Sequence, residues 1–287
     1  MSQAIAHVNG AWLPLADARV SVLDRGLLFA DGVYEVLAAY GGRPFALDGH
    51  VRRLARSLRE IAIRDPHTAA GWERLVQELV DRNGGGDLSV YLQVTRGTDV
   101  SRTAAFPEGA RPTVIGFCQP LPPASPAALA DGVAVVTRPD VRWGRCDIKS
   151  VGLLPNVMAI QHAREHGCNE ALFVRGDRVT EGASSNVFAV LDGAVVTPPL
   201  SHEILPGVTR EVLLRLLRAD GQDVRERDLN LSELLHAQEI WLASTVREVL
   251  PVTRLDGEPA GGGRPGPRWK RAWELFQKEK KGLGAGG

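Results

Sequence analysis

The sequence predicts a two-domain fold of the mixed α+β / α/β class. Of its 287 residues, 44% are hydrophobic and 24% are charged, which allows one large core or two moderate ones. Alternating strand patterns and helical patterns both occur in each half of the chain. A proline-rich stretch at 120–126 separates the halves, and proline stiffens a connector. We therefore expect an N-terminal domain at 1–120, a linker at 121–130 and a C-terminal domain at 131–287.

The first half is predicted to be an antiparallel sheet with two helices. Tight hairpin turns are expected at Asn9-Gly10 and Gly41-Gly42, because these residues adopt positive φ readily. Asp48 is the expected N-cap of the first helix. The apolar spacing predicts helices over 48–62 and 72–81 and strands over 88–95 and 113–118.

The second half is predicted to alternate short strands with helices. Gly167 is expected to end one helix, Asp192-Gly193 to form a turn, and the glycine-rich tail after 280 to be frayed. The apolar spacing predicts strands over 133–137, 171–174, 186–191, 195–197 and 240–243 and helices over 155–166, 208–218 and 267–280.

The composition excludes several classes of partner. The 34 Lys and Arg balance 34 Asp and Glu, with no basic block to follow a phosphate backbone, so we expect no nucleic acid. The longest uncharged segment, 112–130, contains five prolines and cannot be a membrane helix, and residues 1–10 lack the pattern of a secretory signal. Three cysteines without a Cys-x-x-Cys pair fit a reducing cytoplasm.

Common nucleotide and metal motifs are absent from the sequence. It lacks a phosphate-binding P-loop, and the glycine clusters at 84–86 and 261–263 do not join a strand to a helix. The seven histidines are scattered, so we expect no metal site. Lys149 precedes a segment with few charges and can be partly buried. From its position alone, however, an ordinary solvated lysine is the favoured interpretation.

Further motifs change that interpretation. Glu181 to Phe188, Thr197 and Leu205 to Arg210 together resemble the long signature of the fold-type IV pyridoxal-phosphate enzymes. The segments Asp31 to Glu35, His50 to Leu54, Val94 to Thr98, Arg142-Trp143 and Asp147 to Ser150 resemble the D-amino-acid transaminases among them. The resemblance covers roughly residues 8–252. It implies a two-domain enzyme with pyridoxal 5'-phosphate in the cleft between its domains.

The resemblance implies a covalent role for one lysine. Lys149 would form the Schiff base with the cofactor and then move the proton at the substrate α-carbon. Glu181 would keep the cofactor ring nitrogen protonated, although an exposed turn glutamate is the alternative without the flanking signature. We expect cations such as Arg142 and Arg145 to lower the pKa of the Lys149 amine.

The resemblance also implies which residues bind the phosphate of the cofactor. Val208 and Thr209 begin a helix after Gly207, where unpaired amides attract an anion, although an ordinary helix start is the alternative. Arg53 would add a charged contact, yet helical periodicity puts it away from the apolar stripe, as for a surface arginine. Arg53 can lie away from the apolar stripe and still contact the phosphate if its face of the helix borders the cleft between the domains. Ser244 and Thr245 match further positions near the phosphate.

Two residues are assigned to the substrate carboxylate. Tyr34 and Arg102 match family positions that help to select the D configuration, and the arginine reaches across a dimer interface in the family. A buried strand tyrosine and a loop charge are the alternatives. The family has a histidine where this chain has Ala104, with an apparent one-residue insertion before Arg102. Losing a hydrogen bond to a charged group costs about 1.5 to 3 kcal/mol, which weakens this site.

The sequence thus predicts a cytoplasmic homodimeric transaminase that moves an amino group between D-amino acids such as D-alanine and 2-oxo acids such as 2-oxoglutarate. On the same fold, an R-selective amine transaminase, a branched-chain amino acid transaminase and an aminodeoxychorismate lyase are alternatives. A non-catalytic protein that binds small molecules is the alternative of another class.

Overall fold

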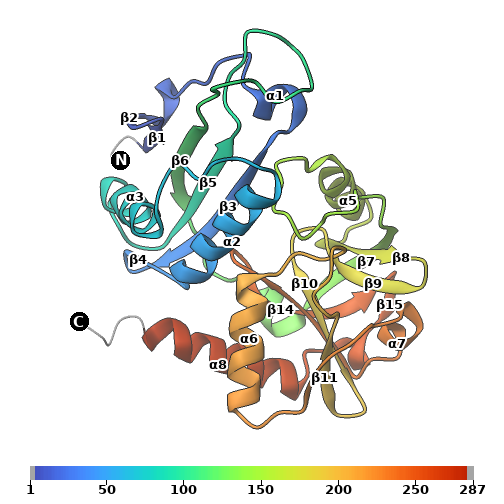
Figure 1. The fold of residues 1–287 in the computed structure, drawn as a ribbon. Helices are drawn as coiled ribbons and strands as arrows, with labels where there is room; N and C mark the ends of the chain where they lie inside the picture. The colour runs from blue at the N-terminus through green and yellow to red at the C-terminus, as the bar shows by residue number, and fades with distance from the viewer. Residues whose placement is uncertain (1–3, 283–287) are drawn as a thin grey trace. The chain divides into compact units, whose positions relative to one another are not determined.

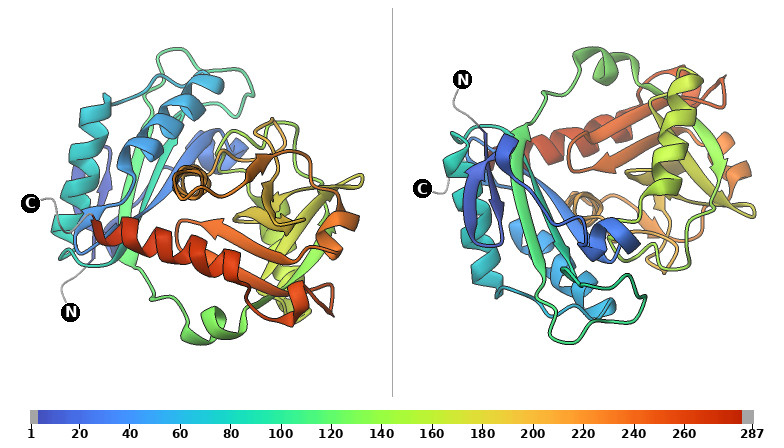
Figure 2. Two further views of the ribbon diagram at one scale, coloured as in Figure 1. Left: turned by 90° about the horizontal axis from the view of Figure 1, so that it is seen from below. Right: turned by 90° about the horizontal axis from the view of Figure 1, so that it is seen from above.

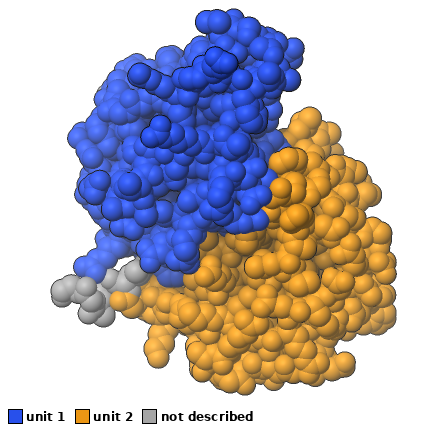
Figure 3. Space-filling model, in the orientation of Figure 1, with its two compact units in different colours: residues 1–122, 148–152 blue, residues 123–147, 153–287 orange. Residues whose placement is uncertain are grey.

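The computed structural model describes residues 4–282, which form two compact units. Unit 1 comprises the chain up to Pro122 together with Ile148–Gly152, and unit 2 comprises Pro123–Asp147 and the chain from Leu153 onward (Figure 3). Each unit combines a sheet with helices, which confirms the predicted α+β character. Of the glycine-rich tail after 280 that is expected to be frayed, residues 281 and 282 belong to the last helix, and 283–287 lie outside the described residues.

Unit 1 is built on an antiparallel sheet of six strands in the order β2-β1-β6-β5-β3-β4 (Figure 1). The strands are β1 (Ile5–Val8), β2 (Ala11–Pro14), β3 (Gly32–Tyr40), β4 (Arg43–Pro44), β5 (Leu88–Thr95) and β6 (Thr113–Pro120). The helices are η1 (Leu15–Asp17), α1 (Arg25–Phe29), α2 (Leu47–Glu60) and α3 (Ala69–Arg82). The turns at Asn9-Gly10 and Gly41-Gly42 join β1 to β2 and β3 to β4 with positive φ, as predicted.

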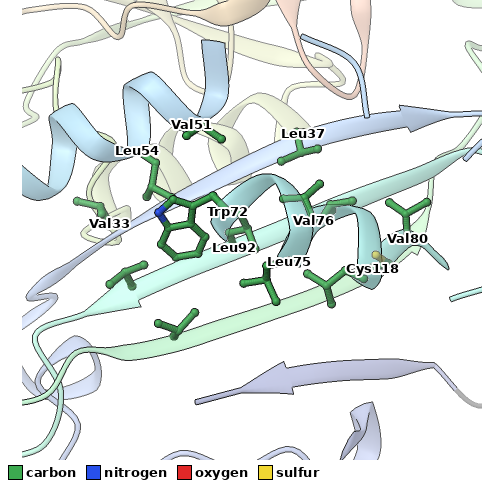
Figure 4. Packing of buried hydrophobic residues seen from close by; sticks show 14 of the residues in the cluster. Val33, Leu37, Val51, Leu54, Trp72, Leu75, Val76, Val80, Leu92 and Cys118 are labelled. Carbon is green, nitrogen blue, oxygen red and sulfur yellow. The ribbon is translucent and has the colours of Figure 1, made fainter. Parts of the chain in front are cut away.

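Helices α2 and α3 supply most of the helical side of the unit 1 core. Trp72, Val76 and Val80 of α3 are fully buried and pack with Leu54 of α2 and with the sheet (Figure 4). The predicted helices over 48–62 and 72–81 are therefore confirmed. The predicted N-cap Asp48 is wrong, because the helix begins at Leu47 after Ala46, whose φ is 49°. Asp48 lies instead in the first turn, where its charge favours the helix dipole.

One later segment of the chain returns to unit 1. Ile148 is buried in the unit 1 core, Tyr34 N donates to Lys149 O at 2.9 Å, and Val151 N donates to Gly32 O at 3.1 Å. The segment therefore lies along β3, although sequence order assigns it to the domain at 131–287. The limits of that domain, of the one at 1–120 and of the linker at 121–130 stay a prediction. The linker range includes most of helix α4 (Pro126–Asp131).

Unit 2 contains a mixed sheet of nine strands. Its order is β12-β11-β10-β13-β14-β7-β8-β9, with β15 paired to β14. The strands are β7 (Val133–Pro139), β8 (Glu170–Arg175), β9 (Arg178–Gly182), β10 (Asn186–Leu191), β11 (Ala194–Thr197), β12 (Val224–Glu226), β13 (Glu239–Ser244), β14 (Glu248–Leu255) and β15 (Glu258–Pro259). The remaining helices are α5 (Leu154–Glu165), α6 (Val208–Ala219), α7 (Leu231–Leu235), η2 (Gly261–Gly263) and α8 (Pro267–Gly282).

Helices cover this sheet in two places. Helix α5 packs against β7 and β8 (Figure 2), and α6 packs against α8, which itself contacts β13 and β14. The predicted strands and helices of this half are confirmed within a few residues, whereas β9, β12, α7, β14 and β15 were not predicted. Strand β14 was not predicted because it contains Pro251, which lacks an amide proton and therefore lowers the strand propensity of the segment. Among residues 4–282, no helix is long and apolar enough to span a membrane.

Candidate functional site

Lys149 and Tyr34 lie side by side in unit 1. The Lys149 Nζ atom is 4.2 Å from the centre of the Tyr34 ring, and the Lys149 carbonyl accepts the Tyr34 backbone amide. The backbone N of Lys149 donates to Ser57 Oγ at 3.4 Å, which ties the segment to α2. Tyr34 also stacks on Tyr91 of β5 with 5.7 Å between ring centres. The structure therefore brings the predicted amine next to the predicted phenol.

Arg53 belongs to a buried charged cluster on α2 and β3. It is only 7% exposed, so the surface position predicted from helical periodicity is wrong. Its Nε and Nη2 atoms each donate to Glu35, to Oε1 and Oε2 respectively, at 2.7 Å. His50 Nδ1 lies 2.8 Å from Glu35 Oε2. Opposite charge from β3 is the physical reason that a guanidinium is stable there.

This cluster has well-defined ionisation behaviour. Burial opposes the charge on Glu35, but Arg53 and His50 outweigh it and lower the pKa of Glu35 to about 2. Burial lowers the pKa of His50 below its usual 6.5; Glu35 opposes that shift, while the charges of Arg53 and Lys149 add to it. The cluster thus holds an anion and a neutral imidazole beside the lysine segment near neutral pH.

Arg102 lies on the exposed loop between β5 and β6, at 96–112. Its guanidinium carbon is 5.3 Å from the centre of the Phe29 ring. The neighbouring carbonyls of Thr103 and Ala104 accept hydrogen bonds from Arg25. Arg102 therefore belongs to unit 1, and its loop is held by hydrogen bonds from Arg25 that the sequence did not predict.

Glu181 is buried in unit 2, at the end of β9 rather than in an exposed turn. Its Oε1 accepts from Arg142 Nη1 at 2.5 Å, and its Oε2 accepts from Asn186 Nδ2 at 3.1 Å and from Leu205 N at 3.0 Å. Arg142 also donates to Asp140 at 2.9 Å. This carboxylate has a fixed orientation set by three donors.

Arg142 and Arg145 form ion pairs with carboxylates of unit 2. Burial opposes the charge of Arg142, but Asp140 and Glu181 raise its pKa well above the usual value. Arg145 pairs with Asp147 at 2.9 Å. Each guanidinium is thus paired with carboxylates of its own unit, and the expectation that their charges act on Lys149 stays a prediction.

Val208 and Thr209 are the first residues of α6, and both are buried. Helix geometry leaves their amides without an intrahelical acceptor. Gly207 precedes them as N-cap, and a Cβ there would lie 1.9 Å from Asn186 Oδ1. A side chain at this position would force Asn186 or the helix start to move, so glycine allows the close approach of Asn186 to the start of α6. The unpaired amides of such a helix start attract an anion.

Ser244 and Thr245 follow β13 on the same sheet. Ser244 ends β13, where Ala243 pairs with Asn186 of β10, and Thr245 lies in the next turn. Arg247 N donates to Ser244 Oγ at 3.4 Å, and Arg247 itself pairs with Glu170 and donates to Ser184 Oγ at 2.7 Å. Strand pairing thus places the end of β13 beside the signature asparagine.

Several contributing residues were not assigned by sequence reasoning. Asn186 connects Glu181 to the start of α6, because its Nδ2 atom also donates to Leu205 O at 3.0 Å. Glu35 and His50 orient Arg53. All three stand inside the motifs quoted above, so their motif membership was the available signal, whereas Arg25 and Asp140 had none.

The donor groups fit pyridoxal phosphate. An amine beside a phenol suits an aldehyde, a buried carboxylate held by fixed donors suits a cationic ring nitrogen, and the α6 start with Gly207 suits a phosphate. Among residues 4–282, no group of three or more His, Cys, Asp or Glu side chains could hold a metal ion.

Comparisons with known proteins agree with this chemistry. The family model described as amino-transferase class IV matches residues 32–255. The D-alanine aminotransferase of Bacillus licheniformis is 40% identical over 269 residues, covering 94% of each chain. The solved branched-chain amino acid aminotransferase of Escherichia coli superposes with a TM-score of 0.89 at 26% identity, covering 96% of this chain and 94% of that one.

A third similar protein carries the cofactor. A hypothetical aminotransferase from Mycobacterium tuberculosis, solved in a PLP-bound form, has a TM-score of 0.84 at 25% identity and covers 96% of this chain and 98% of that one. Together with the geometry of the two units, these matches establish the family and its cofactor. The chain belongs to the class IV aminotransferases and is a pyridoxal-phosphate-dependent enzyme.

Proposed function

We propose that this enzyme transfers the amino group of D-amino acids, such as D-alanine, to 2-oxo acids, such as 2-oxoglutarate. The similarity to the D-alanine aminotransferase of Bacillus licheniformis, at 40% identity, supports the substrate class. The similarity to the branched-chain enzyme is lower, at 26% identity, and favours the same fold rather than the same substrate.

Lys149 is the proposed covalent attachment point of the cofactor. In this proposal Glu181 holds the ring nitrogen, and Val208, Thr209, Arg53, Ser244 and Thr245 hold the phosphate. When bound, the cofactor supplies a conjugated ring that accepts the electron pair of the substrate α-carbon. The buried, oriented carboxylate of Glu181 and the position of Val208 and Thr209 in the first turn of α6 support these assignments.

The Lys149 amine is also the proposed base. Once the substrate amine has displaced it from the cofactor, the Nζ atom would take the proton from the substrate α-carbon and deliver it to the former aldehyde carbon of the cofactor. The single observation that carries the proposal is the 4.2 Å approach of Nζ to the Tyr34 ring, because Tyr34 is the proposed ligand of the substrate carboxylate. Binding the carboxylate at Tyr34 and Arg102 holds the substrate in one orientation, so that one α-proton faces the amine.

The experiment compares a panel of D- and L-amino acids as donors to 2-oxoglutarate, with chiral analysis of the product. We expect turnover of D-alanine and loss of turnover in Lys149→Ala. Borohydride reduction of the wild-type holoenzyme followed by peptide mass spectrometry should locate the cofactor on Lys149. Turnover of L-amino acids alone would contradict the substrate class, and an active, yellow Lys149→Ala would contradict the role of the lysine.

A second candidate substrate class is favoured by Ala104. The family pattern has a histidine at this position, and the methyl group of alanine makes no hydrogen bond to a carboxylate. Primary amines of R configuration, which lack a carboxylate, lose nothing by this change. Adding (R)-1-phenylethylamine to the panel tests this candidate, which fails if D-alanine is turned over and the amine is not.

We further propose a homodimer. Large apolar side chains of unit 2 remain exposed, and three of them, Val141, Leu154 and Met158, line a groove of about 460 Å³. The exposed residues are Val141, Trp143, Leu154, Val157 and Met158. Such patches mark protein interfaces. Sedimentation velocity should give twice the chain mass, and a wild-type monomer at micromolar concentration would refute the dimer.

The proposed location is the cytoplasm. Cys118, Cys146 and Cys168 are all free thiols, and two of them are buried. Unpaired thiols are typical of a reducing compartment. Cell fractionation checks this expectation, and recovery of the protein outside the cytoplasmic fraction would contradict it.

A further inference from the structure

The loop at 96–112 is tightly closed at its base. Gly97 has a φ of 96°, and a Cβ on it would lie 1.9 Å from Arg111 O at the other end of the loop. Arg25 N donates to Gly97 O at 2.9 Å, and Asp24 forms a bridge with Thr98. Helix α1 therefore lies directly against the base of the loop (Figure 1).

The side chain of Arg25 reaches the middle of the same loop. Its Nη1 and Nη2 atoms donate to the carbonyls of Thr103 at 2.7 Å and Ala104 at 3.2 Å. Its Nε atom donates to Asp31 Oδ2 at 2.8 Å. Arg25 is only 2% exposed. The rigid fork of the guanidinium thus joins the residues after Arg102 to a carboxylate before β3.

Asp31 connects this anchor to the core of unit 1. Arg96 Nε donates to the same Asp31 oxygen at 2.7 Å, and Arg96 also donates to the carbonyls of Ile61 and Ala62 just after α2. Burial opposes the charge on Asp31, but the two arginines outweigh it and lower the pKa of that carboxyl. The anchor point is therefore an anion near neutral pH.

Aromatic rings complete the arrangement. The guanidinium carbon of Arg25 is 4.7 Å from the centre of the Phe29 ring, and that of Arg102 is 5.3 Å from it. Arg96 stacks on Phe106 of the loop at 3.6 Å. By contrast, Val100 and Phe106 are 94% and 62% exposed, so burial of apolar surface contributes little to holding the loop. Its conformation depends on the polar anchor.

We propose that Arg25 is a positioning residue that fixes the loop at 96–112 and so determines where Arg102 meets the substrate carboxylate. The proposal rests on the proposed function in one respect, the role of Arg102. Arg25 itself contacts loop carbonyls, Asp31 and Phe29, and acts on the substrate through the loop.

The kinetic test uses Arg25→Ala, Arg25→Lys and Arg102→Ala holoenzymes with D-alanine and 2-oxoglutarate. We expect the KM of D-alanine to rise about tenfold in Arg25→Ala with a much smaller change in kcat, because misplacement of a remote group weakens binding geometry. Arg25→Lys should recover part of this loss, since the ammonium can reach Asp31 but lacks the fork. In the Arg102→Ala background, Arg25→Ala should add little.

Limited tryptic digestion reports the loop independently of substrate. Cleavage after Arg102 should be faster in Arg25→Ala than in the wild type. Arg82→Ala is the matched control, because Arg82 also stacks on an aromatic ring, that of Trp12 at 4.6 Å, and forms an ion pair with Glu78. It should leave both digestion and KM unchanged, while thermal melts and the cofactor absorbance check that every variant is folded and loaded.

The outcomes separate the two proposals. Faster loop cleavage in Arg25→Ala supports the positioning role even if the wild type does not use D-amino acids, a result that would overturn the proposed substrate instead. Unchanged cleavage in folded Arg25→Ala would overturn the positioning role. If the increases in KM caused by Arg25→Ala and Arg102→Ala multiply in the double variant, Arg25 does not act on the substrate through Arg102.

Discussion

Individual buried or partly buried carboxylates organise the candidate site. Asp31 receives hydrogen bonds from two arginines, Glu35 from Arg53, and Glu181 from an arginine, an asparagine amide and a backbone amide. A charge is stable in a protein interior only where partners replace the water that it loses. Each carboxylate therefore fixes the side chains around it, and each is sensitive to neutral replacement.

Glu35→Gln should strongly destabilise the holoenzyme. The change leaves the buried guanidinium of Arg53 without its carboxylate, and breaking a buried pair costs about 3 to 5 kcal/mol. Urea denaturation followed by circular dichroism measures the free energy of unfolding. Glu78→Gln is the control, because its ion pair with Arg82 is 45% exposed on both sides, and the expected loss is under about 1 kcal/mol. Equal losses of unfolding free energy in Glu35→Gln and Glu78→Gln would show that the buried ion pair stabilises the protein no more than the exposed one.

At the scale of elements, the start of α6 combines three constraints. Gly207 allows a close approach of Asn186, Asn186 orients Glu181, and the first amides of the helix have no intrahelical acceptor. Strand β10 supplies the asparagine and β9 supplies the glutamate, so the position of the helix start depends on sheet pairing. A change at the glycine should therefore affect both Glu181, the proposed ligand of the ring nitrogen, and the proposed phosphate site at the start of α6.

Gly207→Ala should weaken cofactor binding more than it weakens the fold. The added Cβ forces the Asn186 side chain or the helix start to move, because the unshifted contact would be 1.9 Å. We expect the Kd for pyridoxal phosphate to rise at least about tenfold, as for a loss of one or two charge-assisted hydrogen bonds. Cofactor titration monitored by absorbance measures it. Gly282→Ala in α8 is the control, because the Cβ position of Gly282 has open space around it, and this variant should bind pyridoxal phosphate normally. An unaltered Kd in Gly207→Ala would refute the role of the α6 start in binding the phosphate.

For the whole molecule, the buried ionisable groups predict loss of stability in acid. The folded-state pKa of His50 is lowered below 6.5, so the unfolded chain binds this proton more readily and stability falls as pH drops below that value. The pKa of Glu35 falls from 4.5 to about 2, so its contribution is present above 4.5 and is lost between that value and about 2. Glu35 alone accounts for about 3 kcal/mol of this dependence.

Urea midpoints measured from pH 8 to pH 3 should therefore decline slowly below about 6.5 and more steeply below about 4.5. In Glu35→Gln, the steep part of the decline should become shallower, because the titrating carboxyl is gone. A wild-type stability that rises as the pH falls from 6 to 3 would contradict both assignments.

The sequence by itself determined the local elements and the identity of the chemically important residues. The strand over 88–95 and the turns at Asn9-Gly10 and Gly41-Gly42 occur as predicted, because backbone preference and apolar periodicity are properties of neighbouring residues. The order of the motifs around Glu181 and Lys149 was sufficient to indicate the family. Their roles in binding the cofactor stay a prediction.

Only the tertiary structure decided which of these residues are buried and what they contact. Periodicity assigned Arg53 to the surface, yet Glu35, 18 residues away, makes its burial favourable. Lys149 joins β3 of the first unit although it follows the predicted linker, and Arg25 holds a loop 78 residues further along the chain. The physical reason for Arg53 and Arg25 is that the free energy of burying a charge depends on partners that folding brings from distant parts of the sequence. For Lys149 it is the pairing of its backbone with β3 and the burial of Ile148.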